Sequence, residues 1–204
     1  MPASAASGEP CGERTFYLVR HGACERAPGP GQGRLNDLGR EQAELIADAL
    51  ADRPIEAIHV STLQRAGETA EAVLRRHLNA PVRRAHLPRE CIPPVTDAQH
   101  SEFKDRYDFW PDEERAGACA GWLDRAHRRY FKLTRGPARE KVVVAHGNAI
   151  RYLVACALGA DPRGWLAMDT HNCGLTRIRI ERDRGAVLIS FNETGHLRAE
   201  LRTL

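Results

Sequence analysis

Short apolar runs alternate with stretches of helical periodicity along most of the chain. Apolar runs of strand length cover residues 16–19, 55–60 and 141–145, and a weaker run covers residues 81–86. Between these runs, apolar residues recur three and four positions apart, which is the spacing of one helix face. This alternation predicts an α/β fold of three layers, α/β/α, with a mostly parallel central sheet.

Some element boundaries carry local signals. The helical pattern over residues 38–51 begins just after Asn36 and Asp37, either of which is a suitable N-cap. Ser61 and Gln64 have the spacing of a capping box, so we expect the next helix to start there.

The second half of the chain is less regular. Residues 90–115 are rich in proline, acidic and aromatic residues, and we expect them to be irregular. A helix follows with Trp122 among its apolar positions, and another has Leu158 on its buried side. Residues 174–180 and 186–191 then predict a β-hairpin.

Length and local composition predict one domain. The chain has 204 residues, and residues 14–204 show no repeat or linker. Residues 1–13 are rich in Ala, Ser, Gly and Pro, and we expect a flexible tail. They show neither the basic nor the apolar region of a signal peptide. No apolar run in the chain approaches the roughly 20 residues needed to cross a bilayer, so we expect no membrane partner.

Charge and cysteine usage narrow the class further. The 30 Lys and Arg residues against 27 Asp and Glu residues leave a formal net charge of +3. This surplus is small and scattered, so no nucleic-acid partner is expected. The six cysteines show no CxxC and no regular spacing. We therefore expect reduced thiols and a cytoplasmic location.

Charged and histidine side chains follow four of the expected strands. Arg20 and His21 follow the first strand, Arg65 the second, Glu90 the third, and His146 the strand over residues 141–145. Because the carboxyl ends of parallel strands meet at one edge of a sheet, we expect these side chains to converge there.

The convergence points to phosphate chemistry. Arg20 and Arg65 can bind phosphoryl oxygens through paired hydrogen bonds. One of His21 and His146 would attack phosphorus, and the other, held protonated near the anion, would stabilise the transition state. Glu90 could protonate the leaving group. The residues alone leave open which histidine attacks. Since no HxH or HExxH pattern is present, we expect no metal and no cofactor.

Four segments carry a family resemblance: LVRHG at 18–22, LNDLGREQA at 35–43, STLQRA at 61–66 and HGN at 146–148. Together they resemble the histidine phosphatase superfamily, also called the phosphoglycerate-mutase-like fold. The resemblance implies that His21 becomes a phosphohistidine and that Glu90 is the proton donor. It implies a phosphate pocket formed by Arg20, Arg65 and His146. We also expect Gly147 and Asn148 to bind substrate.

The nearest likeness within the superfamily is to phosphoglycerate-mutase-like serine/threonine protein phosphatases. It implies that the substrate is a phosphoserine or phosphothreonine protein or peptide. Residues 23–28 lack the Trp-Asn run usual in mutases, so hydrolysis is favoured over transfer. The alternatives are a phosphoglycerate mutase, a small-molecule phosphatase, or a catalytically weak scaffold of the same fold.

Two further features bear on substrate choice and on assembly. Residues 100–114 combine aromatic and acidic side chains, including Trp110. They could border the pocket and select substrates, or simply pack this loop onto the domain. Trp165 and the closing strands could form a homodimer interface.

Overall fold

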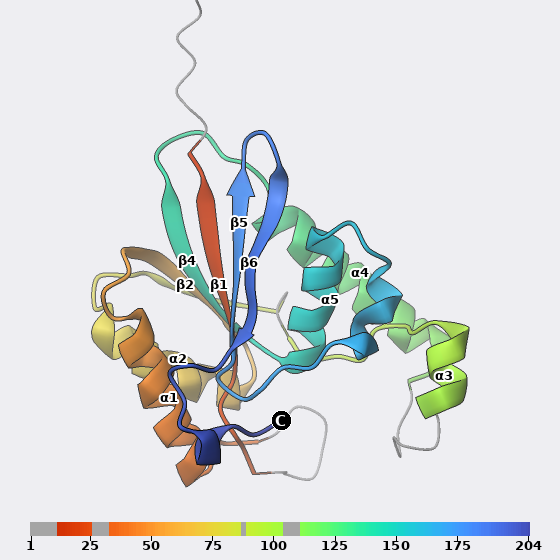
Figure 1. Ribbon diagram of the computed structural model, residues 1–204, viewed down its shortest axis with the longest axis horizontal. Helices are drawn as coiled ribbons and strands as arrows, with labels where there is room; N and C mark the ends of the chain where they lie inside the picture. The colour runs from red at the N-terminus through yellow and green to blue at the C-terminus, as the bar shows by residue number, and fades with distance from the viewer. Residues whose placement is uncertain (1–11, 26–32, 87–88, 104–110) are drawn as a thin grey trace, which may run out of the picture.

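The computed structural model describes residues 12–25, 33–86, 89–103 and 111–204 (Figure 1). Their centre is a six-stranded sheet with the order β3-β2-β4-β1-β5-β6. The strands are β1 (Arg14–Arg20), β2 (Ile55–Ser61), β3 (Val82–Ala85), β4 (Arg139–Ala145), β5 (Leu175–Glu181) and β6 (Gly185–Glu193). The first four strands are parallel, and β5 and β6 form the predicted antiparallel hairpin beside β1.

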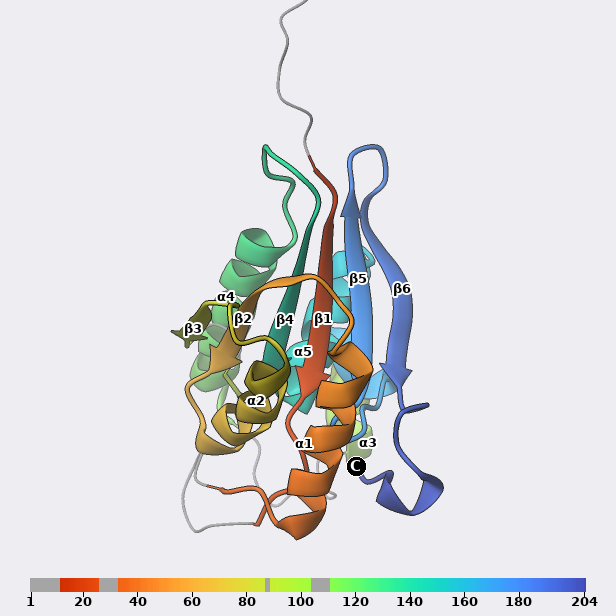
Figure 2. The same cartoon turned by 90° about the vertical axis from the view of Figure 1, so that its left-hand side faces the viewer.

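Helices cover both faces of this sheet (Figures 1 and 2). Helices α1 (Asp37–Leu50) and α2 (Gln64–Arg76) lie on one face, and α4 (Glu113–Tyr130) and α5 (Gly147–Ala157) lie on the other. The shorter elements are α3 (Asp97–Phe103) and the 3-10 segments η1 (Pro162–Ala167) and η2 (Ala199–Leu201). The predicted three-layer α/β/α fold is confirmed.

The central strands are buried on both faces. Tyr17 and Val19 of β1 pack in the core on the α1 and α2 side, whereas Phe16 and Leu18 pack on the α4 and α5 side. Side chains of a strand alternate between faces, so a strand covered on both sides must be apolar throughout. The strand ends are therefore anchored by two cores, which gives the residues after them a rigid base.

One predicted N-cap is confirmed and one is wrong. The Asn36 side chain accepts a hydrogen bond from Gly39 N at 2.8 Å and so caps α1. The capping box at Ser61 does not form, because Ser61 still belongs to β2 and Leu63 occupies the N-cap of α2. The Ser61 hydroxyl lies instead 2.8 Å from Nε2 of His146.

The segment expected to be irregular contains a helix. The seven-residue α3 is too short to show a periodic pattern, and it follows Thr96, whose Oγ1 accepts from Gln99 N at 3.3 Å. Trp122 and Leu158, both expected to be buried, are exposed, at 38% and 54%. The predictions for residues 1–11 and 104–110, including Trp110, lie outside the described residues.

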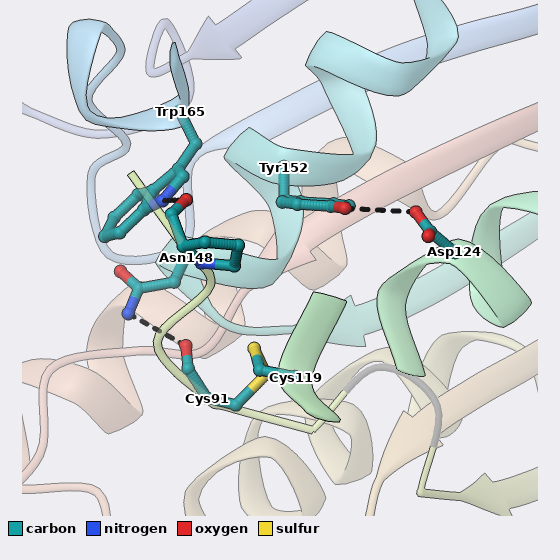
Figure 3. The surroundings of a disulfide bond; sticks show 7 residues. Cys91, Cys119, Asp124, Asn148, Tyr152 and Trp165 are labelled. Atoms are coloured by element: carbon teal, nitrogen blue, oxygen red, sulfur yellow. Dashed lines mark hydrogen bonds between the residues drawn. A yellow bond between two sulfur atoms is a disulfide. The ribbon is translucent and has the colours of Figure 1, made fainter. Parts of the chain in front are cut away.

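The cysteine prediction is wrong for one pair. Cys91 and Cys119 form a disulfide with their Cα atoms 5.8 Å apart, although they are 28 residues apart in the chain (Figure 3). Cys91, Ile92 and Val95 pack against a small core around Leu123 of α4, and this packing brings the two thiols together. Cys24, Cys156 and Cys173 are free.

Trp165, which could have formed a homodimer interface, is buried inside the subunit. Only 3% of its surface is exposed, and it packs in the same small core as Cys119 and Leu123, so it is not available to a second copy. Across the described ranges, no helix is both long and apolar enough to cross a membrane.

Replacing Gly39 with alanine is expected to destabilise the protein by roughly 3 kcal/mol. A Cβ at Gly39 would lie 1.9 Å from the carbonyl oxygen of Ala23, in the loop that follows β1. The matched control is Gly117→Ala in α4, where a Cβ meets nothing within 4 Å. That change should stabilise the helix by about 0.5–1 kcal/mol. Urea unfolding measures both variants, and equal effects would contradict this close approach of α1 to the loop.

Candidate active site

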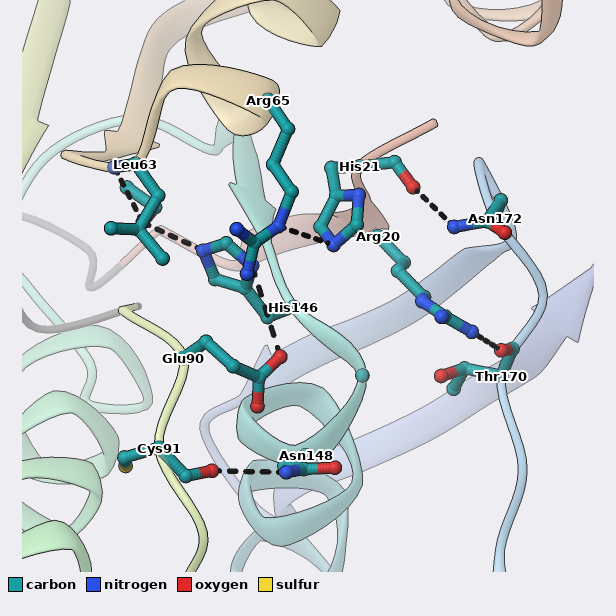
Figure 4. A network of polar contacts seen from close by, with 12 residues as sticks. Arg20, His21, Leu63, Arg65, Glu90, Cys91, His146, Asn148, Thr170 and Asn172 are labelled. Atoms are coloured by element: carbon teal, nitrogen blue, oxygen red, sulfur yellow. Dashed lines mark hydrogen bonds and ion pairs between the residues drawn. The ribbon is translucent and has the colours of Figure 1, made fainter. Parts of the chain in front are cut away.

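The structure brings the predicted side chains together at the carboxyl edge of the sheet. Arg20 ends β1 and His21 follows it, Arg65 lies in the first turn of α2, and His146 follows β4. Glu90, from the irregular segment before α3, faces them (Figure 4). The sequence-based expectation that these side chains converge is met.

The hydrogen bonds of His21 fix its tautomer. Nδ1 lies 2.7 Å from the carbonyl oxygen of Gly22, which can only accept, so Nδ1 carries the proton. Nε2 accepts from Nε of Arg65 at 2.9 Å. Burial, and then the charge of Arg65, lower the pKa of His21 to about 3. At neutral pH, His21 is therefore an uncharged imidazole whose Nε2 lone pair points at a guanidinium group.

The backbone around His21 is held by residues that sequence reasoning missed. Gly22 N donates to Oγ1 of Thr69 at 3.1 Å, and the Asn172 side chain donates to the His21 carbonyl oxygen at 3.1 Å. Thr69 lies one helical turn after Arg65, so its place on the same face of α2 was a usable signal. Asn172 precedes β5, and nothing local in the sequence indicates its contact with His21.

His146 lies beside His21, with 5.0 Å between the ring centroids. Its side chain is fully buried; Nε2 contacts the Ser61 hydroxyl, and Nδ1 lies 3.8 Å from Oε2 of Glu90. Burial first, and then the neighbouring His21 and Arg65, lower the pKa of His146 well below its usual value. His146 is therefore uncharged when no anion is bound, and its expected protonation near a bound phosphoryl group stays a prediction. A phosphate dianion would have to raise this pKa before His146 could carry charge.

The Arg20 side chain lies against Gly147 at the start of α5. A guanidinium nitrogen of Arg20 donates to the carbonyl oxygen of Thr170. Its Nε is buried with no hydrogen-bond partner in the described part of the chain. A Cβ at Gly147 would lie 3.2 Å from Oγ1 of Thr170 and 3.5 Å from Nε of Arg20. A side chain at position 147 would therefore crowd Thr170, which accepts from Arg20, and would make ordinary contact with Arg20 itself.

Asn148, predicted to bind substrate, makes two protein contacts. Its Nδ2 donates to the carbonyl oxygen of Cys91 at 3.0 Å, and its Oδ1 accepts from Arg151 at 2.6 Å. Asn148 thus joins α5 to the residue after Glu90. Arg151 was not singled out from the sequence, although it lies one helical turn after Gly147 and its charge acts on Glu90.

Glu90 has a raised pKa, as a proton donor near neutral pH requires. Burial raises its pKa to about 7, against the opposing effects of Arg65, Arg20 and Arg151. The side chain is 26% exposed, but Oε1 is buried and finds no hydrogen-bond partner among the residues described. A carboxyl group with this pKa is protonated in a large fraction of molecules near neutral pH.

Two helix N-termini complete the site. Helices α2 and α5 both begin at this edge, and neither has a side-chain hydrogen bond at its N-cap. Uncapped N–H groups and the helix dipole favour a bound anion. With two guanidinium groups beside them, these termini can hold a phosphoryl group next to a neutral nucleophile and a protonated acid. The described residues contain no group of three or more His, Cys, Asp or Glu placed to hold a metal ion.

Comparison with known proteins gives relatives of the same type. The Caenorhabditis elegans protein named "Serine/threonine-protein phosphatase Pgam5, mitochondrial" is 34% identical over 194 residues, covering 90% of this chain and 64% of that protein. The Homo sapiens protein of the corresponding name is 30% identical over 200 residues, with the same coverage of 90% and 64%. The chain spans less than two thirds of the length of these two relatives. Their names support the prediction of a phosphatase enzyme.

A solved structure shares the fold. The α-ribazole phosphatase from Shigella flexneri superposes with a TM-score of 0.70 at 21% sequence identity, covering 88% of this chain and 96% of that one. At this identity, the likeness concerns the fold alone.

The relatives overturn the predicted location. They are named mitochondrial, which contradicts the cytoplasmic location inferred from composition and cysteine usage. The Cys91–Cys119 disulfide also contradicts the reduced thiols on which that inference partly rested.

A family model covers nearly all of the folded chain. The match runs over residues 16–194, from within β1 to just beyond β6, and so includes His21, His146 and all of β2 to β6. The predicted family is confirmed: the chain belongs to branch 1 of the histidine phosphatase superfamily.

Proposed function

We propose that this protein hydrolyses phosphoserine or phosphothreonine in proteins or peptides through a phosphohistidine on His21. Residues 14–204 would form the catalytic domain. The observation that carries the proposal is the Nε2 atom of His21, which is unprotonated and lies 2.9 Å from Nε of Arg65. A nucleophile with its lone pair directed at a cation suits attack on a phosphoryl group that the same cation binds.

The first step transfers the phosphoryl group to the protein. Arg20, Arg65 and the N-termini of α2 and α5 bind the phosphoryl oxygens. Nε2 of His21 attacks phosphorus, and the bond from phosphorus to the ester oxygen breaks. Glu90 gives its proton to that oxygen, so a neutral alcohol leaves and Glu90 becomes a carboxylate.

The second step releases phosphate. Water attacks the phosphorus of the phosphohistidine, and the Glu90 carboxylate takes a proton from it. The N–P bond breaks, and its electron pair returns to Nε2 of His21. His21 and Glu90 are then back in their starting protonation states, and the phosphoryl group leaves as hydrogen phosphate, which carries the oxygen and the second hydrogen of the water. Positive charge comes from Arg20 and Arg65, so the steps use no metal.

The choice of a protein substrate is supported by the relatives. Serine/threonine-protein phosphatases at 30% and 34% identity cover 90% of this chain. Their names also favour action in mitochondria.

The test compares hydrolysis with transfer in the presence of EDTA. Phosphoserine and phosphothreonine peptides, p-nitrophenyl phosphate and 3-phosphoglycerate are supplied separately, and both phosphate release and phosphoglycerate interconversion are measured. We expect phosphate release from the peptides and no interconversion. Strong interconversion with negligible hydrolysis would identify a mutase instead. Turnover of none of these esters by the folded protein would indicate a binding module, and inhibition by EDTA would point to a metal.

A further inference from the structure

The proton donor is placed by its chain segment more than by its own contacts. The Glu90 carboxyl group receives a backbone hydrogen bond from Cys91, and its Oε2 lies 3.8 Å from Nδ1 of His146. Oε1 has no hydrogen-bond partner among the described residues. Residues 89–96 form neither helix nor strand. The position of Glu90 therefore depends on what holds this segment against the rest of the molecule.

Besides the packing of Ile92 and Val95 on the small core around Leu123, a disulfide and two hydrogen bonds hold it. Cys91, the residue next to Glu90, is joined to Cys119 of α4 by the disulfide (Figure 3). The Cys91 carbonyl oxygen accepts from Nδ2 of Asn148 at 3.0 Å. Farther along, the Pro94 carbonyl oxygen accepts from Nε1 of Trp165 at 3.1 Å.

The disulfide is the covalent contact of the three, and it is adjacent to the acid. The Asn148 bond holds only the backbone of Cys91, and the Trp165 bond lies four residues from Glu90. Either hydrogen bond can lengthen while the segment stays in place, whereas the covalent S–S bond fixes the distance between Cys91 and Cys119. Proton transfer needs donor and acceptor oxygens within about 2.6–3.2 Å. A shift of about 1 Å can cost on the order of 10²-fold in rate.

We infer that the Cys91–Cys119 disulfide positions Glu90 for proton transfer, so that reducing this bond slows hydrolysis of phosphate esters with poor leaving groups. The inference rests on the proposed function. The reductant is a dithiol: its thiolate attacks one sulfur, the S–S bond breaks, and a second attack releases the oxidised dithiol. The products are two protein thiols. Cys91 is partly exposed whereas Cys119 is 3% exposed, so attack occurs at Cys91.

The neighbouring free thiol does not compete for this disulfide. Cys156 packs against the same small core as Cys119, and burial raises its pKa to about 11. Since the thiolate is the attacking species, Cys156 is a poor nucleophile at neutral pH. It is also the matched control for a cysteine substitution in this core.

The experiment uses two substrates that differ in their need for an acid. A phosphoserine peptide releases an alkoxide that must be protonated, whereas p-nitrophenyl phosphate releases a stable anion. Both are assayed with the oxidised protein, the dithiothreitol-reduced protein, the reoxidised protein, and the Cys91→Ser, Cys119→Ser and Cys156→Ser variants. Peptide mapping reports the disulfide, and thermal melting reports folding.

We expect reduction, Cys91→Ser and Cys119→Ser to lower kcat on the peptide roughly tenfold, which is part of the contribution of about 10²–10⁴ attributed to a general acid as a whole. The rate on p-nitrophenyl phosphate should change less than threefold by the same reasoning. Reoxidation should restore the peptide rate, and Cys156→Ser should leave both rates unchanged.

A double-mutant cycle separates positioning of Glu90 from a general loss of structure. In the Glu90→Gln background, reduction should have no further effect on the ratio of the two rates, because the acid is already absent. Equal losses on both substrates, a persisting effect in that background, or two free thiols at Cys91 and Cys119 in the purified protein would each overturn the inference. If the oxidised protein turns over neither substrate, the proposed function itself fails.

Discussion

Replacing His21 with alanine is expected to lower kcat on a phosphoserine peptide by on the order of 10⁴-fold or more, as removal of a nucleophile does in other enzymes with covalent intermediates. The reason is geometric. Nε2 of His21 is unprotonated and accepts from Nε of Arg65, and Nδ1, on the other side of the ring, donates to the carbonyl oxygen of Gly22. With the imidazole removed, the guanidinium groups can still bind phosphate, but nothing accepts the phosphoryl group.

The corresponding change at His146 tells the two histidines apart. Its Nε2 is engaged by Ser61 and its Nδ1 faces Glu90, so neither nitrogen is directed at Arg65. When ³²P-labelled substrate is mixed with protein and rapidly quenched in alkali, His146→Ala should still form an acid-labile label, at a reduced rate. His21→Ala should form none. A label that persists in His21→Ala and disappears in His146→Ala would reverse the assignment.

A control separates loss of the nucleophile from loss of structure. His86 is exposed after β3, and His86→Ala should retain the wild-type rate.

The folded pKa of His21 is depressed to about 3, so the unfolded chain binds a proton near pH 6.5 that the folded protein does not. His21 therefore destabilises the folded protein increasingly as pH falls from about 6.5 toward 3. His21→Ala should be less sensitive to acid unfolding than the wild type.

The strand ends were predictable because two independent patterns coincide there. Buried strands read as apolar runs, and the side chains that follow them differ sharply in chemistry: Arg20 and His21 after β1, and His146 after β4. Parallel strands then require these ends to meet at one edge. Only the sheet topology was needed to place the site, and alternating strands and helices predict that topology.

What the sequence did not reveal depends on contacts between distant segments. Whether Ser61 caps a helix or contacts His146 is decided by the place of β4 beside β2, not by the spacing of Ser61 and Gln64. The pairing of Cys91 with Cys119 likewise follows from how the segment after Glu90 packs on α4. The residue pattern alone leaves open which histidine attacks; the family resemblance favours His21, and the hydrogen-bond partners of its two ring nitrogens support that assignment.

Replacing Glu90 with glutamine is expected to lower kcat on a phosphoserine peptide about 10²–10⁴-fold, the usual contribution of a general acid. Glutamine keeps the size of the side chain but cannot donate a carboxylic proton to the leaving oxygen. The loss on p-nitrophenyl phosphate should be much smaller, because nitrophenolate leaves without protonation. Glu71→Gln, on the exposed face of α2, is the control and should change neither rate.

The pH dependence follows from the same carboxyl group. Its pKa of about 7 means that Glu90 loses its proton as pH rises through 7, so kcat/KM should fall about tenfold per pH unit above that point. Phosphate monoesters gain their second negative charge near pH 6, and His21 is already neutral there. The wild type should therefore be most active between about pH 6 and 7. In Glu90→Gln the fall above pH 7 should be absent, and an unchanged alkaline limb would remove Glu90 from the mechanism.

Glu90→Gln should lower the activity of the protein but raise its stability at alkaline pH. The pKa of Glu90 rises from 4.5 to about 7 on folding, so between these values the unfolded chain releases a proton that the folded protein retains. Stability is therefore lost as pH rises through this window, and above pH 7 the folded protein holds a poorly solvated carboxylate. Glu90→Gln removes that penalty and should stabilise the protein at pH 8 by roughly 1–3 kcal/mol, an advantage that disappears below about pH 4.5. A variant that is less active and also less stable at pH 8 would mean that Glu90 serves the fold rather than proton transfer.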